Sequence, residues 1–217
     1  MTNIDLSPDA VARLSPDELI TTLRRLDPAS DAARQLDIDV VARAIDPKKL
    51  SREQFVDLLA VLGDLADAGA AVNLSQLDPQ NFARLIARAG KDQIEAVTSQ
   101  PVLRERILDE VFRRMEVHFR ADRAGSTKAV VHWRISGAAT DDGYDRYETV
   151  IENETCAVSK NGSREPRATV TLTPVDFLKL VTGNASAPVL FMTGKLKVAG
   201  DLAFAAGLTN LFTIPKA

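Results

Sequence analysis

Few side chains of this 217-residue chain have the chemistry for catalysis, and they are scattered. His118 lies near the end of an expected helix among charged residues, and His132 alternates outward on an expected strand. Cys156 has no neighbour in sequence that would activate its thiol, so we interpret it as a buried strand cysteine. Carboxylates are plentiful, but they occupy solvated helix faces and form no distinct acid–base pair. The inventory predicts a protein that is not an enzyme.

The same residue types predict neither a metal nor a cofactor. A single cysteine excludes an internal disulfide and a zinc-binding cysteine cluster. The first 117 residues contain no histidine and no cysteine, which excludes a metal-binding helical bundle with imidazole ligands. Gly194-Lys195 is no phosphate loop, because the first glycine of that motif is absent and no Ser or Thr follows the lysine.

Composition and charge exclude further classes of function. The net charge is −3, the pI is near 5.5 and mean hydropathy is −0.07, so no basic face is expected and nucleic acid is not a predicted partner. No apolar run is long enough to cross a bilayer. The first nine residues lack the regions of a secretory signal, and Pro215-Lys216-Ala217 is no peroxisomal address. We expect a soluble, cytoplasmic protein with at most transient membrane contact.

Glycine and the aromatic residues divide the chain into two parts. Eight of the eleven glycines, the single Trp and both Tyr lie at or after Gly125. Turn glycines with aromatic and β-branched runs are typical of sheet, and their scarcity is typical of helices. The sequence therefore predicts an all-helical region over 1–100 and a sheet-containing domain over 101–217.

Helix-start signals recur in the first part. Ser7-Pro8, Ser15-Pro16 and Asp78-Pro79 each place a capping residue before a proline, and Ser15/Glu18 and Ser51/Gln54 have capping-box spacing. Five segments share a loose Leu-Ser/Asp opening, at Leu6, Leu14, Leu36, Leu50 and Leu77. Their spacing fits no solenoid of known period. We expect a helical bundle or array that serves either to dock a protein partner or as a lid.

The second part predicts an α+β layer fold. An amphipathic helix over 102–119 precedes four antiparallel-looking strands near 128–136, 144–151, 156–158 and 168–173. A helix capped at Thr173, a strand over 195–198 and a last helix over 202–212 follow.

The last helix is apolar around nearly its whole circumference, with only Thr209 and Asn210 polar between Asp201 and Phe212. A second apolar stretch, 187–192, stands in a connecting position. These residues either complete an ordinary core or line a lumen for an apolar ligand.

A family resemblance favours the lumen. Residues 167–212, and above all the Phe191-Met192-Thr193-Gly194-Lys195-Leu196-Lys197-Val198-Ala199-Gly200-Asp201 string, resemble the sterol carrier protein type 2 family. The resemblance implies a five-stranded sheet covered by helices that enclose a hydrophobic tunnel. It implies that the protein binds and carries a fatty acid, acyl-CoA, phospholipid or sterol. The implied lipid-binding residues are Trp133, Phe177, Leu180, Val181, Phe191, Met192, Leu196, Val198, Phe204, Leu208, Leu211 and Phe212.

The alternative is a non-enzymatic interaction module or accessory subunit with a collapsed or vestigial tunnel. Family domains also stand behind thiol-dependent isomerases with a metal-binding bundle, but the lack of histidine before His118 excludes that arrangement.

Overall fold

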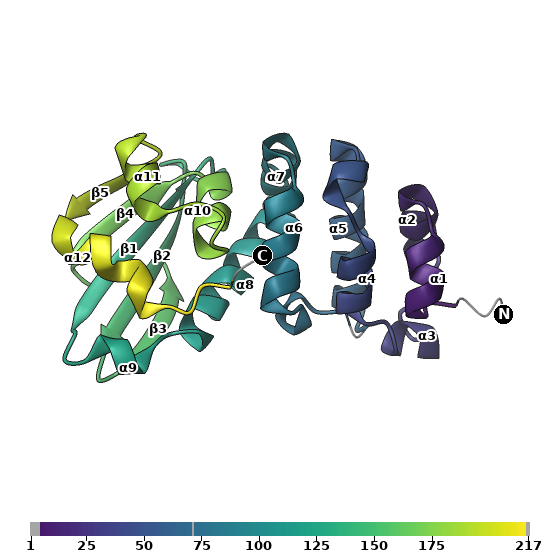
Figure 1. Cartoon of the computed structure of the whole chain (residues 1–217), viewed down its shortest axis with the longest axis horizontal. Helices are drawn as coiled ribbons and strands as arrows, with labels where there is room; N and C mark the ends of the chain where they lie inside the picture. The colour runs from purple at the N-terminus through teal and green to yellow at the C-terminus, as the bar shows by residue number, and fades with distance from the viewer. Residues whose placement is uncertain (1–4, 71, 216–217) are drawn as a thin grey trace. The chain divides into compact units, whose positions relative to one another are not determined.

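The computed structural model describes residues 5–70 and 72–215. The chain forms two compact units that divide between Arg104 and Glu105, inside helix α8 (Pro101–Val117) (Figure 1). The predicted domain boundary at residues 100 and 101 stands at the start of that helix, and whether each part folds alone stays a prediction. The sequence expectations about residues 1–4 and 216–217 lie outside the described residues.

The first unit is helical, and its helices begin where the capping signals predict. Ser15 and Ser51 form complete capping boxes with Glu18 and Gln54. The Asp78 carboxylate accepts from two backbone N–H groups at the start of its helix. The elements are α1 (Pro8–Arg13), α2 (Pro16–Arg24), α3 (Asp31–Arg34), α4 (Ile38–Ala44), η1 (Pro47–Lys49), α5 (Arg52–Asp67), η2 (Leu74–Gln76), α6 (Pro79–Arg88) and α7 (Lys91–Thr98).

These helices form a stack of three hairpins, α1–α2, α4–α5 and α6–α7 (Figure 1). The first helices pack in the order α1, α4, α6, and the second helices in the order α2, α5, α7. Each hairpin opens on the Leu-Ser/Asp pair noted in the sequence and carries an Ala-Arg pair at the same place in its first helix, at Arg13, Arg43 and Arg84. The three hairpins therefore share a short sequence pattern, although they open at unequal intervals, at Leu6, Leu36 and Leu77.

The capping glutamines link each hairpin to the one before it. Gln54 Oε1 accepts from the Ser51 N–H, while its Nε2 donates to Asp17 in α2 at 2.6 Å. Gln93 likewise caps its own helix, and its Nε2 donates to the carbonyls of Pro47 and Leu50, at 2.9 Å each. The first hairpin has Glu18 at this position, which serves its own cap. Helix capping and repeat stacking thus use the same side chain.

The second unit contains a five-stranded sheet in the order β3-β2-β1-β4-β5, which confirms the predicted α+β fold. One expectation was wrong: β1 and β4 pair in parallel, and the other neighbouring pairs are antiparallel. Alternation along a strand reveals its faces but not its neighbour, so the pattern could not indicate this pairing. The strands are β1 (Ala129–Ser136), β2 (Tyr144–Glu152), β3 (Thr155–Lys160), β4 (Ala168–Leu172) and β5 (Leu196–Gly200).

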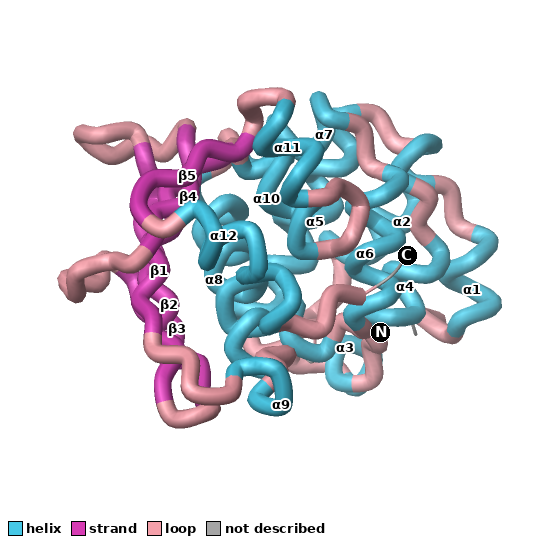
Figure 2. The backbone as a smooth tube through the Cα atoms, turned by 60° about the vertical axis from the view of Figure 1, so that its left-hand side comes forward, coloured by secondary structure: helices cyan, strands magenta, loops and turns pink. Residues whose placement is uncertain are grey.

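Helices cover one face of this sheet (Figure 2). Two differences from the sequence expectation matter. The apolar stretch before β5 forms helix α11, which was expected only as a connection, and the last helix changes to 3-10 geometry after Gly207. The helices after α8 are α9 (Ala121–Ala124), α10 (Pro174–Val181), α11 (Ala187–Met192), α12 (Leu202–Gly207) and η3 (Leu208–Leu211).

An aromatic core joins helix and sheet in the second unit. The Phe112 ring stacks on Tyr147 with centroids 3.9 Å apart and on Phe177 at 4.9 Å, and meets Trp133 edge-on at 5.9 Å. Offset and edge-on pairs of this kind add stability beyond the area they bury. The cluster therefore holds α8 and α10 against the sheet.

Candidate functional site

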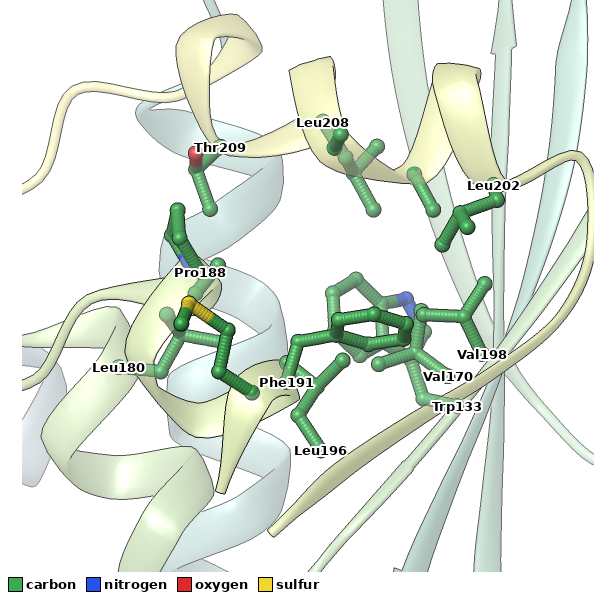
Figure 3. A pocket seen from close by; sticks show the side chains of 14 residues that line it. Trp133, Val170, Leu180, Pro188, Phe191, Leu196, Val198, Leu202, Leu208 and Thr209 are labelled. Atoms are coloured by element: carbon green, nitrogen blue, oxygen red, sulfur yellow. The ribbon is translucent and has the colours of Figure 1, made fainter. Parts of the chain in front are cut away.

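A cavity of about 290 Å³ lies between the sheet and the helices that follow it (Figure 3). Strands β1, β4 and β5 form one wall, and α10, α11, α12 and η3 form the others. Its volume is close to the lower end of ligand pockets, roughly 300–1,000 Å³. The lining residues are Trp133, Val170, Leu180, Ala187, Pro188, Phe191, Met192, Leu196, Val198, Leu202, Ala205, Ala206, Leu208 and Thr209.

Sheet register forms the floor of the cavity. Trp133 pairs with Val170 across the parallel ladder, and Val170 pairs with Val198 across the antiparallel one. All three line the cavity, because residues opposite one another share a face of the sheet. The Trp133 Nε1–H donates to the buried Thr149 Oγ1 at 2.9 Å, so the indole contributes carbon surface to the floor.

Backbone geometry at Gly200 places the last helix over the cavity. Gly200 has φ +88°, and a Cβ there would lie 2.5 Å from the Arg167 carbonyl oxygen, so only glycine fits. Asp201 then caps α12 through the Phe204 N–H, and its other oxygen accepts from Arg167. Those two interactions lower the pKa of the Asp201 carboxyl. Gly200 and Asp201 thus determine where α12 begins.

The cavity has a buried floor and an open mouth. Trp133 in the floor and Leu208 in the η3 wall are 4% and 3% exposed, whereas Met192 is 84% exposed, Leu202 50% and Phe191 43%. An apolar ligand that enters between α11 and α12 would therefore lose contact with water progressively.

The lining offers no ionisable side chain. Its only side-chain heteroatoms belong to Trp133, Met192 and Thr209. A lining of this composition suits a hydrocarbon ligand.

A comparison with known protein families finds a match in the second unit. Residues 108–213 match the SCP-2 sterol transfer family. The second unit is an SCP-2 domain. This match confirms the resemblance inferred from the sequence string.

Individual proteins resemble the chain at low identity. It is 26% identical over 126 residues to hydroxysteroid dehydrogenase-like protein 2 of Xenopus laevis, covering 57% of this chain and 28% of the frog protein. The chain thus spans under a third of that relative. Sterol carrier protein 2 like 2 of Aedes aegypti is 19% identical with a TM-score of 0.39, covering 50% of this chain and 94% of that one. The inverting sec-alkylsulfatase Pisa1 of Pseudomonas sp. is 14% identical with a TM-score of 0.40, covering 94% of this chain and 30% of that one.

Seven of the twelve residues predicted to bind lipid line the cavity of the SCP-2 domain. They are Trp133, Leu180, Phe191, Met192, Leu196, Val198 and Leu208. A ligand-binding role for each stays a prediction.

The other five predicted residues lie outside the cavity lining. Phe177 is fully buried in the aromatic core, and the Phe212 ring meets Phe119 at 5.8 Å. The Arg167 guanidinium lies 4.4 Å over the Phe204 ring. Leu211 is buried and Val181 is half-buried at the end of α10. Helical periodicity identified these residues as apolar but could not separate the core side of a helix from its cavity side.

Seven lining residues were missed: Val170, Ala187, Pro188, Leu202, Ala205, Ala206 and Thr209. A signal existed for Val170, because it alternates with the threonines of its strand and faces the same side as Trp133. The alanines of α12 were recognised as part of an unusually apolar helix. Because alanine side chains are small, they leave space between a helix and a sheet, and this space forms part of the cavity.

The histidines and the cysteine lie outside the cavity lining. Cys156 is buried, as expected, and burial raises the pKa of its thiol to about 12. The His132 ring bonds Glu148 at 3.1 Å on β2. Burial and the Asp109 carboxylate, which accepts from its hydroxyl, raise the pKa of Tyr147. Across residues 5–70 and 72–215, no acidic, His or Cys side chains gather into a possible metal site, and no helix has the length and hydropathy to span a membrane.

Proposed function

We propose that the SCP-2 domain binds one long-chain lipid in the cavity between the sheet and α10–α12, and carries it without chemical change. The observation that carries this proposal is the cavity lining, which is apolar and has no ionisable side chain. The family match supports it independently.

A hydrocarbon chain suits this cavity energetically. Each methylene taken from water is worth about 0.8 kcal/mol. Met192 at the mouth is unbranched and flexible, so it can adapt to ligands of different shape. A polar headgroup would remain near the exposed mouth, because the lining offers it little hydrogen bonding.

In this proposal the protein is a cytoplasmic carrier and not an enzyme. The helical unit would serve it as a docking element for a protein partner or as a lid. Fatty acid, acyl-CoA, phospholipid and sterol remain the candidate ligand classes.

A chain-length series tests the proposal. Saturated fatty acids of increasing length would compete with a fluorescent fatty acid on the full chain, while native mass spectrometry records stoichiometry. We expect one ligand per chain. The Kd should fall about fourfold for each added methylene until the cavity is full, and then level off.

Two results would overturn the proposal. One is the absence of saturable binding with all four ligand classes. The other is an affinity that ignores chain length, which would indicate adhesion to the surface.

A further inference from the structure

The sheet of the SCP-2 domain has a second face, opposite the cavity, which we call the outer face. Among the described helices of this domain, none covers it (Figure 2). Successive residues of a strand point to opposite faces. Arg134 is exposed, whereas its neighbours Trp133 and Ile135 are buried on the helix side, so the Arg134 side chain lies on the outer face.

Three cationic side chains share one row across the outer face. Arg146 of β2 lies directly opposite Arg134, Thr171 of β4 lies on the other side of Arg134, and Lys197 of β5 follows Thr171. Arg134, Arg146 and Lys197 are all exposed, and we call them the basic row. Because neighbouring strands are about 4.8 Å apart, the four strands spread the row over about 14 Å.

Only one charge of the basic row is balanced within the domain. The Arg146 Nε–H donates to the Asp142 carboxylate at 2.7 Å. Across the part of the chain that the structure describes, neither Arg134 nor Lys197 has an ion pair or a side-chain hydrogen bond. The row therefore has two unpaired positive charges, in a chain whose net charge is −3.

The carboxylates of the other outer-face rows have partners of their own. Glu148 is only 4% exposed, and it accepts from the Arg164 N–H at 2.9 Å and bonds the His132 ring. Glu152 pairs with the Arg164 guanidinium at 3.5 Å. These acidic groups are engaged away from the basic row and leave its charge in place.

The position of Arg134 is unfavourable for the fold. Like charges directly opposite one another destabilise a sheet, and Arg134 faces Arg146. Lysine on an edge strand protects against edge-to-edge aggregation, which accounts for Lys197 on β5. Arg134 lies on the central strand β1, where no edge needs protection. A residue that costs stability without a structural gain indicates a functional surface.

We propose that the basic row binds an acidic segment of a partner protein. A guanidinium presents a fork of N–H donors that matches a carboxylate, and arginine is enriched in protein interfaces. A partner carboxylate between Arg134 and Arg146 would also relieve the repulsion between them. The partner thus supplies the negative charge that the domain lacks at this row.

Other occupants fit the outer face less well. Three cations neutralise few phosphates, and among the described outer-face residues Tyr144 is the only aromatic one for a base to stack on, and it is half-buried. A bilayer would require apolar side chains to insert, but no large exposed hydrophobic residue of the described chain lies on these strands. A two-fold contact between copies would bring two basic rows together.

This docking goes beyond the proposed function and does not depend on it. Neither Arg134 nor Lys197 lines the cavity. A partner held on the outer face would leave the cavity mouth between α11 and α12 open, so docking and lipid exchange could occur together.

Fluorescence anisotropy of the full chain tests the docking. The probe is a fluorescein-labelled peptide of alternating glutamate and serine, and the reference peptide has glutamine in place of glutamate. We expect saturable binding of the acidic peptide alone, weakened by added salt. Arg134→Gln and Lys197→Gln should each weaken it by up to about fivefold, the range of exposed ion pairs. The double charge reversal Arg134→Glu/Lys197→Glu should abolish it.

Thermal melts separate a docking role of Arg134 from a structural one. Arg134→Glu places opposite charges across from each other at Arg146, so the Tm of the SCP-2 domain, followed by Trp133 fluorescence, should rise. A structural role for Arg134 predicts a fall in Tm.

The matched control reverses two other charges. Arg25→Glu/Lys48→Glu changes the net charge by the same amount at exposed cations of the helical unit, and it should bind the acidic peptide like the wild type. The double variant of the basic row should keep the wild-type affinity for fatty acid, because neither of its residues lines the cavity.

The outcomes separate this docking from lipid binding. No saturable peptide binding, binding that survives the double reversal, an equal loss in the control, or a fall in Tm with Arg134→Glu overturns the docking. Single-stranded DNA of equal charge that binds more tightly than the peptide, or phosphatidylglycerol vesicles that bind in its place, assigns the row to another partner and overturns it as well. Peptide binding without fatty-acid uptake supports the docking and overturns only the proposed function.

Discussion

The two units of this chain differ in how much apolar surface they expose to solvent. Among the described residues, six large hydrophobic side chains are exposed, and five of them belong to the SCP-2 domain. The sixth, Val102, stands in the first turn of α8. The helical unit buries the apolar stripes of its helices between successive hairpins. The SCP-2 domain instead has a cavity with exposed apolar side chains at its mouth.

The difference shows how each unit is stabilised. Side-chain hydrogen bonds join neighbouring hairpins in the stack. Gln54 and Gln93 each donate such a bond to the hairpin before their own. The SCP-2 domain has a stacked aromatic core beside its cavity. This close-packed core stabilises the domain although the neighbouring cavity is not filled by side chains. Buried side-chain hydrogen bonds thus add to the apolar core of the first unit, whereas the second unit combines an aromatic core with a cavity. Four predictions test this comparison.

The largest effect is expected at Leu208, a buried residue of the cavity lining. Leu208→Trp should fill the space and abolish fatty-acid uptake, with a change below about 1 kcal/mol in the free energy of unfolding without ligand. Displacement titration and denaturant melts measure the two quantities.

Leu211→Trp is the matched control, since Leu211 is buried outside the cavity lining. Overpacking there should cost about 1–3 kcal/mol whether or not lipid is present. A comparable loss of apo stability in Leu208→Trp would show that residue to be ordinary core.

Phe177 tests the aromatic core. It is fully buried and contacts the rings of Phe112 and Trp133. Phe177→Ala should destabilise the SCP-2 domain by about 3–5 kcal/mol. Fluorescence of Trp133, the only tryptophan, follows this domain alone. If added lipid restores the lost stability in full, Phe177 belongs to the cavity after all.

Gln93 tests the hydrogen-bonded stack. Gln93→Glu keeps the oxygen that caps α7 but loses the N–H that donates to Pro47 and Leu50. A buried acceptor facing two carbonyl oxygens should cost about 1–3 kcal/mol. Far-UV circular dichroism melts report it. Gln54→Glu should cost less, because that amide bonds at an exposed site, and Glu18→Gln should be nearly neutral. Equal effects at all three positions would refute the link between hairpins.

Sequence patterns predicted the local elements of both units better than the cavity. Capping residues such as Ser15 and Ser51 placed helix starts correctly, because a cap is satisfied by atoms within one turn. The parallel pairing of β1 with β4 escaped prediction, because it joins segments separated by two other strands. The sequence predicted only part of the cavity lining, because the lining also joins segments that are far apart in the chain. Phe177 and Leu180 share a helix face in the sequence pattern, yet one packs in the core and the other lines the cavity.

The smallest effect is expected from removing the helical unit. A fragment of residues 101–217 keeps the whole of α8, every strand and every residue of the cavity lining. It should fold and bind fatty acid with a Kd within about twofold of the full chain, because no lining residue is lost. The first unit would then modulate the carrier and not build its site. Stopped-flow release of a fluorescent fatty acid distinguishes its possible roles: a lid predicts faster release from the fragment, whereas a docking element predicts unchanged release. An insoluble or unfolded fragment would show that the two units share one core, and the comparison between them would no longer hold.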